Sequence, residues 1–135
     1  MMAPARPKIL IADDDRNVLR IIELALSDEH FQLIFAEDGP NALAIAEKER
    51  PDMVILDIRL PGVDGFEVLK TLRGKSSQGL YDEMVIILLS SASFEKTITQ
   101  GFKEGADDFI TKPFSPGNLK SRVKSWLIRK GITVS

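Results

Sequence analysis

The chain has 135 residues, 44% of them hydrophobic and 28% charged, a size and composition that suit one globular domain. It has no cysteine and a single histidine, His30, so disulfides, thiolate catalysis and metal sites built from several histidines are excluded. With a net charge of -2 and no long run of Lys or Arg, it lacks the electrostatic footprint of a nucleic-acid-binding protein. No apolar stretch approaches the roughly 20 residues of a membrane span, and residues 1–7 lack the apolar centre of a secretory signal, so we expect a cytoplasmic protein.

The first half of the chain alternates strand-length apolar runs with stretches of helical period. The runs that predict strands are residues 8–12, 31–36 and 53–57. The residues that predict an apolar face on the helix between the first two strands are Val18, Ile21, Ile22, Ala25 and Leu26. A second helix is expected to begin at Asp38-Gly39-Pro40, because proline suits the first helical turn. The residues expected on its inner face are Ala42, Ile45 and Ala46.

The second half continues the same alternation. The turn Pro61-Gly62 leads into a short third helix, and residues 74–79 predict a polar loop. Residues 85–89 form a continuous apolar run, typical of a buried parallel strand. Ser93 is expected to cap a fourth helix that stops near Gly105, and residues 109–111 predict the fifth strand. Ser115-Pro116 then begins a fifth helix, whose expected core residues are Leu119, Val123, Trp126 and Leu127.

Five strands that alternate with five helices predict an α/β fold, (βα)5, with a parallel sheet covered on both faces. Right-handed crossovers favour the flavodoxin-like strand order 2-1-3-4-5, in which the first and third strands are neighbours at the switch point. We expect one domain over residues 8–128, with an N-terminal tail at 1–7 and a C-terminal tail at 129–135.

Polar side chains follow four of the predicted strands, and in a parallel sheet these strand ends meet at one edge. They are Asp13, Asp14, Asp57, Ser90 and Lys112. Each alone could be an ordinary cap, turn or surface residue, and Asp15 is expected to cap the first helix. Together they suit phosphoryl transfer, because carboxylates bind Mg²⁺, an aspartate can become an aspartyl-phosphate, and an ammonium and a hydroxyl can hold phosphoryl oxygens. The Lys112–Pro113 bond is a candidate for a cis peptide.

In this arrangement the chain resembles a response-regulator receiver domain of two-component signalling over residues 8–128. The motifs that carry the resemblance are Asp13-Asp14, Asp57 with Leu60-Pro61-Gly62, Ser90, Gly105-Ala106 and Lys112-Pro113-Phe114. The resemblance implies that Asp57 accepts a phosphoryl group from a histidine kinase or a phosphotransfer protein. It also implies that Mg²⁺ is bound by Asp13, Asp14, Asp57 and the backbone carbonyl of Arg59.

The resemblance further implies a conformational switch. Lys112 would pair with the phosphoryl oxygens, Ser90 would swing its hydroxyl onto them, and Phe109 would rotate inward. The surface of the fourth helix, fifth strand and fifth helix would carry the signal to an output partner or domain, or to a phosphorylation-dependent homodimer. The chain would then be a signalling phosphoacceptor that assists only its own phosphorylation and dephosphorylation, and not an enzyme.

The chain departs from the family pattern at several positions. Ser91 is a second candidate for the switch hydroxyl, although the interval to Lys112 favours Ser90. Phe109 lacks the hydroxyl of a tyrosine, so a switch there relies on packing. Arg59 and Ala92 occupy variable positions linked to aspartyl-phosphate lifetime, and the polar loop of residues 74–83 is longer than usual.

Two other functions remain alternatives. A haloacid-dehalogenase-like phosphatase would use Asp13 as nucleophile and Asp15 as acid/base, with Asp107-Asp108 as metal ligands. Asn17 fits that class poorly, and the class gives Asp57 no role. A receiver-like interaction module that works without phosphorylation is disfavoured, because such domains generally lose an acid or the lysine that this chain keeps.

Overall fold

The computed structural model describes residues 6–27, 29–76, 84–91 and 95–132. The strands within this part of the chain are β1 (Lys8–Ala12), β2 (Gln32–Ala36), β3 (Met53–Asp57), β4 (Val85–Ser90) and β5 (Asp108–Thr111). The helices are α1 (Arg16–Leu26), α2 (Gly39–Glu49), α3 (Gly65–Ser76), α4 (Glu95–Lys103) and α5 (Pro116–Arg129). No helix of the described residues is long and apolar enough to cross a membrane.

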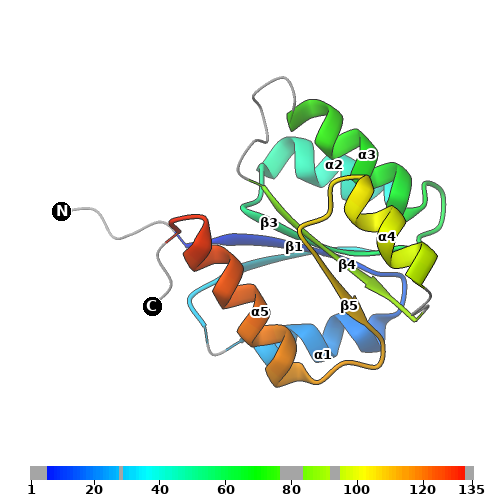
Figure 1. Ribbon diagram of the computed structural model, residues 1–135. Helices are drawn as coiled ribbons and strands as arrows, with labels where there is room; N and C mark the ends of the chain where they lie inside the picture. The colour runs from blue at the N-terminus through cyan, green and yellow to red at the C-terminus, as the bar shows by residue number, and fades with distance from the viewer. Residues whose placement is uncertain (1–5, 28, 77–83, 92–94, 133–135) are drawn as a thin grey trace.

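The five strands form one parallel sheet in the order β2-β1-β3-β4-β5, which confirms the predicted (βα)5 flavodoxin-like fold. Helices α1 and α5 cover one face of the sheet, and α2, α3 and α4 cover the other (Figure 1). The register brings the carboxyl ends of neighbouring strands level, with Asp57 opposite Leu89 and Ser90 opposite Thr111. Side chains that follow these strands therefore share one edge of the sheet.

Strand alternation divides the core into two layers. Along β3, Met53 and Ile55 pack with α1 and α5, while Val54 and Leu56 pack with α2 and α3. Every residue of β3 and β4 is buried. This burial on both faces explains why the central strands are continuous apolar runs without a polar alternation.

Three of the predicted helix starts are confirmed by their caps. Asp15 Oδ1 accepts from Asn17 N–H at 2.9 Å, and Asp38 Oδ1 accepts from Asn41 N–H at 2.7 Å. Ser115 Oγ accepts from Asn118 N–H at 3.3 Å, with Pro116 in the first turn. These caps satisfy backbone donors that have no partner inside the helix. The predicted cap Ser93 lies outside the described residues.

Some element bounds differ from the prediction. Helix α3 runs to Ser76, so Gly74 is helical and the prediction of a loop from residue 74 is wrong. A Cβ at Gly74 would meet nothing within 4 Å, and one glycine at an exposed position weakens a helix without ending it. Residues 77–83 of that predicted loop lie outside the described residues. β2 begins at Gln32 and β5 at Asp108, each one residue from the predicted start.

Helix α1 packs on a stripe that overlaps the predicted one, because Ile22 and Leu26 are buried and Val18 packs against the same core layer. Its buried residues are Leu19, Ile22 and Leu26, whereas Ile21 is 43% exposed. The helix carries more apolar residues than one stripe can bury, so periodicity alone does not determine which stripe faces the sheet. At the C-terminal end, Arg129 belongs to α5, and Ile132 packs against the core layer of α1 and α5.

Candidate functional site

The carboxylates of Asp13, Asp14 and Asp57 form a cluster, with one oxygen of each within 4.8 Å of the others. Asp13 continues the alternation of Ile9 and Ile11, and Asp57 continues that of Met53 and Ile55. Residues two apart in a strand point to the same face, so both carboxylates leave the sheet edge on the side of α1 and α5. Asp13 and Asp57 are buried and Asp14 is exposed, which leaves one open side to the cluster.

Lys112 joins the two buried carboxylates. Its Nζ lies 2.7 Å from Asp13 Oδ2 and 3.2 Å from Asp57 Oδ2. Its backbone N–H donates to the Ser90 carbonyl at 2.7 Å, and the peptide bond to Pro113 is cis, as predicted. The ammonium is therefore held at the edge where a group attached to Asp57 would lie.

Backbone donors fix the orientation of the carboxylates. Asp13 Oδ1 accepts from Asp15 N–H at 2.9 Å, and Asp57 Oδ1 accepts from Arg59 N–H at 3.2 Å. Gly65 begins α3 directly against the backbone of Asp57: an added Cβ would lie only 2.2 Å from the Asp57 carbonyl oxygen. Sequence reasoning missed Gly65, and its position just before an apolar helical run was the available signal.

The site holds more negative than positive charge. Burial raises the pKa of Asp57 from 3.8 to about 6, and the charge of Asp13 acts in the same direction, against Lys112 and the Arg59 N–H. Burial acts to lower the pKa of Lys112, but its hydrogen bonds to the two carboxylates and their charges prevail and raise it. The two buried carboxylates beside one ammonium leave a net negative charge, which favours binding of a further cation. The ligands available are carboxylate oxygens, which suit Mg²⁺.

The two candidate hydroxyls occupy different environments. Ser90 ends β4 and is 5% exposed, next to Leu89, which pairs with Asp57. Ser91 is exposed and lines a mainly apolar hollow of about 310 Å³ beside Lys112. Both lie near the acidic cluster, and the preference for Ser90 stays a prediction.

The predicted switch residue Phe109 lies on β5, with its side chain toward α4. Phe109 is already buried, with only 8% of the residue exposed, and an added Cβ at Gly101 of α4 would lie 3.5 Å from its ring. The expected inward rotation would therefore have to start from another conformation of this ring, and it stays a prediction. Arg59, the predicted carbonyl ligand, is exposed and lines a hollow of about 420 Å³ together with Asp14.

The hollow beside Lys112 contains further residues that sequence reasoning assigned elsewhere. Val18 and Ile21 of α1 line it together with Pro113 and Phe114. The prediction placed both residues of α1 on the core face of their helix, which holds for Val18, since it also packs against the core layer of α1 and α5, but not for Ile21. The surplus of apolar residues on this helix was the signal that a second, outward-facing surface exists.

The phosphatase alternative is wrong in its geometry. Asp107 and Asp108 lie at the amino end of β5, whereas Asp13 follows the carboxyl end of β1, so they lie at opposite edges of the sheet. Asp107 instead has a structural partner: its Oδ2 accepts from Arg73 at 2.6 Å and from the Ile86 N–H at 2.8 Å. Arg73 also donates at 2.7 Å to the carbonyls of Gly105 and Met84, which fastens α3 to this opposite edge.

Comparison with known proteins agrees with this arrangement. The family model of the response regulator receiver domain matches residues 9–124. The chain is 39% identical to the alkaline phosphatase synthesis transcriptional regulatory protein PhoP of Bacillus subtilis over 125 residues, which are 93% of this chain and 50% of that protein. It is 40% identical over 124 residues to the probable transcriptional regulator ycf27 of Porphyridium aerugineum, covering 92% of this chain and 49% of that one. The chain thus spans about half the length of these curated relatives.

Solved structures give the same result. The chemotaxis protein CheY4 of Vibrio cholerae superposes with a TM-score of 0.81 at 31% identity, over 91% of this chain and 100% of that one. A putative response regulator from Chloroflexus aurantiacus superposes with a TM-score of 0.84 at 34% identity, over 93% and 100% of the two chains. Fold, strand-end cluster and relatives agree, and this chain belongs to the family of response regulator receiver domains, signalling modules of two-component systems.

Proposed function

We propose that Asp57 accepts a phosphoryl group from the phosphohistidine of a histidine kinase or a phosphotransfer protein. The observation that carries this proposal is the contact of Lys112 with both buried carboxylates, Asp13 and Asp57, beside the exposed Asp14. The ligands that we propose for Mg²⁺ are Asp13, Asp14, Asp57 and the backbone carbonyl of Arg59. Bound Mg²⁺ would supply positive charge for the phosphoryl oxygens.

In the proposed transfer, a carboxylate oxygen of Asp57 attacks the phosphorus in line. The new O–P bond forms as the P–N bond to the donor imidazole breaks, and the imidazole nitrogen retains the electron pair of that bond. Lys112 then exchanges part of its contact with carboxylates for contact with a phosphoryl oxygen, and it needs little movement because its Nζ is already 3.2 Å from Asp57. The backbone N–H of Arg59 keeps the carboxylate oriented.

The hollow formed by α1 and the segment after Lys112 supports docking of the phosphoryl donor. Its apolar lining lies directly beside the ammonium. Ile21 is 43% and Leu24 58% exposed on the outer surface of α1, which suits contact with a partner protein. A donor domain bound there would bring its histidine to the acidic cluster. We also propose that the receiver lies in the cytoplasm, where it would meet such a kinase.

For the output we propose that Ser90 binds the phosphoryl group and that Phe109 transmits the change. Phe109 packs against α4 at Gly101, so a new position of the ring would shift α4 relative to β5. The surface of α4, β5 and α5 would then bind the output partner or form a phosphorylation-dependent homodimer. This requires the phosphorylated form to favour one of two conformations.

The test of the proposal is phosphorylation with acetyl phosphate and Mg²⁺, followed by intact-mass measurement. The parent chain should gain one phosphoryl group and Asp57→Asn none, while Asp38→Asn, which removes a half-buried carboxylate at a helix cap, should be labelled like the parent. Labelling of Asp57→Asn would overturn the assignment. A parent chain that takes no label would instead favour the phosphorylation-independent interaction module.

A further inference from the structure

The loop between β3 and α3 lies against the start of α2. The Gly39 N–H donates to the Pro61 carbonyl at 3.0 Å, and an added Cβ at Gly39 would lie only 1.9 Å from the Val63 carbonyl oxygen. The contact is reciprocal, because Gly62 adopts a φ of 82° and an added Cβ there would lie 2.8 Å from the Pro40 ring. The helix start and the loop therefore approach this closely only because neither glycine has a side chain.

This loop contains Arg59, whose backbone is held on both sides along the chain. Before it, the Ile58 N–H donates to the Leu89 carbonyl of β4 at 3.0 Å. After it, Leu60 is buried in the core layer of α2 and α3, and the Pro61 carbonyl is bound by the start of α2. Among the described residues, no donor forms a hydrogen bond to the Arg59 carbonyl. That oxygen is thus available to a cation, and its position depends on β4 before it and on α2 after it.

We propose that Gly39 is a positioning residue for the Mg²⁺ site. The inference rests on the proposed function, in which the Arg59 carbonyl is a ligand of the ion. Because non-bonded carbon and oxygen atoms stay roughly 3 Å or more apart, a Cβ at Gly39 would displace the Val63 carbonyl by about 1 Å. The displacement is passed along the loop through Pro61 to Arg59. Mg²⁺ demands near-octahedral geometry with ligand distances of about 2.1 Å, so a shifted carbonyl binds it less well.

A positioning role and a purely structural role predict different results. If Gly39 served folding alone, its substitution would lower the free energy of unfolding but leave the Mg²⁺ affinity of the folded molecules unchanged. A positioning residue instead changes the affinity of molecules that remain folded. Groups that orient metal ligands typically alter metal affinity by about 10–100-fold when they are changed. We expect Gly39→Ala to raise the dissociation constant for Mg²⁺ by about tenfold, the lower end of this range.

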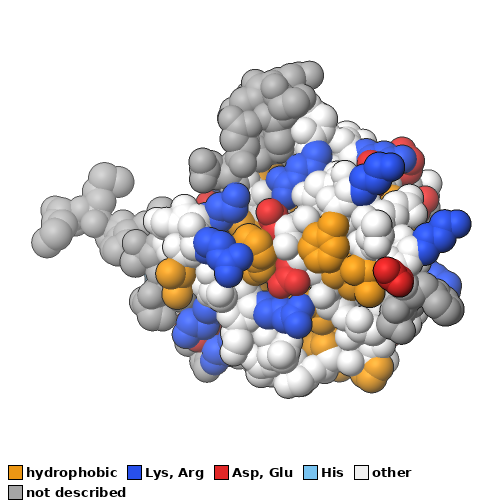
Figure 2. All heavy atoms as spheres, viewed as in Figure 1, with side chains coloured by type: hydrophobic (Ala, Val, Ile, Leu, Met, Phe, Trp, Pro, Cys, Tyr) orange, Lys and Arg blue, Asp and Glu red, His pale blue; other side chains and the backbone are white. Residues whose placement is uncertain are grey.

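The matched control is Gly117→Ala. Like Gly39, Gly117 lies in the first turn of a helix beside a proline and near a polar cap, but an added Cβ there would lie 3.8 Å from Ser115 Oγ, an ordinary contact distance. Its helix, α5, covers the opposite face of the sheet from α2 (Figure 1). In Figure 2, Lys and Arg side chains surround hydrophobic ones where α5 and β5 reach the surface. A substitution in α5 should leave the Mg²⁺ affinity unchanged.

Two further variants separate affinity from stability. Pro40→Ala removes the ring that lies against Gly62 without adding an atom, and it should raise the dissociation constant about two- to threefold. Arg73→Ala destabilises the fold at the opposite edge of the sheet and should leave the constant unchanged.

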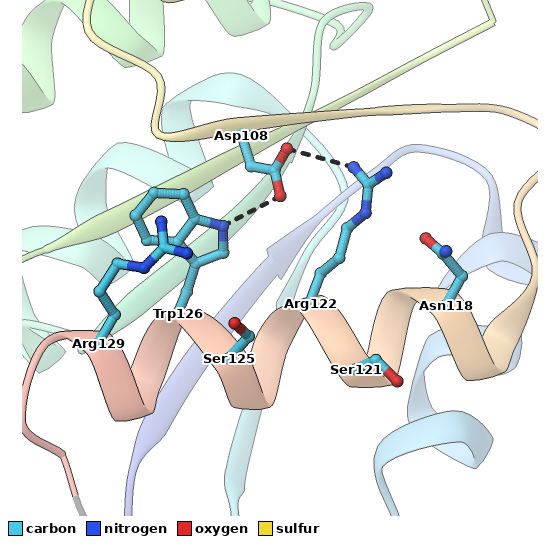
Figure 3. Close-up of a pocket in the computed structure, with 7 residues that line it drawn as sticks. All are labelled: Asp108, Asn118, Ser121, Arg122, Ser125, Trp126 and Arg129. Carbon is cyan, nitrogen blue, oxygen red and sulfur yellow. Dashed lines mark hydrogen bonds and ion pairs between the residues drawn. The ribbon is translucent and has the colours of Figure 1, made fainter.

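The stability of each variant is measured in urea by the fluorescence of Trp126, the only tryptophan of the chain. Figure 3 shows Trp126 on α5, where its Nε1 donates to Asp108 at 3.0 Å. Asp108 stands at the amino end of β5, the opposite end from the Lys112 segment, so this fluorescence monitors the fold away from the Mg²⁺ site.

The experiment is calorimetric titration of Mg²⁺ into the full chain, at a temperature at which every variant tested is folded. Acetyl phosphate labelling gives a second readout: the Mg²⁺ concentration for half-maximal rate should rise in Gly39→Ala by the same factor as the dissociation constant. The rate at saturating Mg²⁺ should stay near that of the parent. If Gly39→Ala does not fold, Pro40→Ala decides the question by the same two measurements.

Unchanged Mg²⁺ affinity in both Gly39→Ala and Pro40→Ala, beside a parent that binds the ion, would overturn the inference and leave the proposed function intact. An equal loss of affinity in Arg73→Ala would also overturn it, because affinity would then follow stability. A parent chain that binds no Mg²⁺ would overturn the proposed metal site itself, and the inference with it.

Discussion

Removing the charge of Asp57 should stabilise the metal-free protein. The folded state raises the pKa of this carboxyl from 3.8 to about 6 through burial and the nearby Asp13, so ionised Asp57 weakens the fold at neutral pH. Because a tenfold change in proton affinity corresponds to about 1.4 kcal/mol, the upper limit of the gain is about 3 kcal/mol. Relaxation around the site reduces this, and we expect Asp57→Asn to raise the free energy of unfolding by about 1–2 kcal/mol.

The sign of the pH dependence follows from the same shift. A raised pKa means that the folded state binds the proton more tightly than the unfolded state, so the contribution of Asp57 to stability is greatest below about pH 4. It is lost as the pH rises through about 6. The difference between Asp57→Asn and the parent should therefore be near zero at acid pH, grow between about pH 4 and 6, and stay constant above.

The assay is urea unfolding with EDTA at several pH values, followed by circular dichroism. Asp38→Asn is the control, because Asp38 is a half-buried cap of α2 and asparagine caps as well as aspartate. It should change the free energy of unfolding by less than about 0.5 kcal/mol. A parent protein that is more stable than Asp57→Asn at about pH 7.5 would refute the reasoning, because the Lys112 contact would then outweigh burial and the charge of Asp13.

Three further predictions concern the metal, the turn and the opposite edge of the sheet. Millimolar Mg²⁺ should raise the melting temperature of the parent, and Asp13→Asn should remove most of that increase in a thermal scan. Gly65→Ala should lower the free energy of unfolding by roughly 2–3 kcal/mol in urea, because its Cβ would meet the Asp57 backbone, whereas Gly74→Ala should raise it by about 0.5–1 kcal/mol. Arg73→Ala should destabilise the fold by roughly 1–3 kcal/mol in the same assay, yet leave the amount of phosphoryl label taken up from acetyl phosphate unchanged.

Local patterns were sufficient to predict the sheet and the neighbourhood of the site. Buried central strands are continuous apolar runs, and their order follows from right-handed crossovers, so the convergence of Asp13, Asp57 and Lys112 could be expected before any coordinates. Asp13 and Lys112 follow a strand directly, and Asp57 is the last residue of β3. Their positions therefore depend on the sheet alone and not on how the helices pack.

Features that depend on packing between distant segments could not be predicted in this way. The stripe of α1 that faces the sheet is chosen by α5 and the strands beneath it, so Ile21 was placed on the wrong side. Arg73 contacts residues 11 to 34 positions away in the chain, and no periodicity in the sequence marks such a contact.

Strand β5 connects two surfaces that have been described separately. Arg122 of α5 donates to the carbonyl of Phe109, and three residues further along the chain, just after β5 ends, Lys112 contacts Asp57. The four residues of this strand span only about 13 Å, so the two contacts lie close together. If an output partner bound to α5 and a phosphoryl group on Asp57 prefer different positions of β5, thermodynamic reciprocity applies, and each changes the affinity for the other by the same factor. Binding of an output partner would then also change how readily Asp57 is phosphorylated.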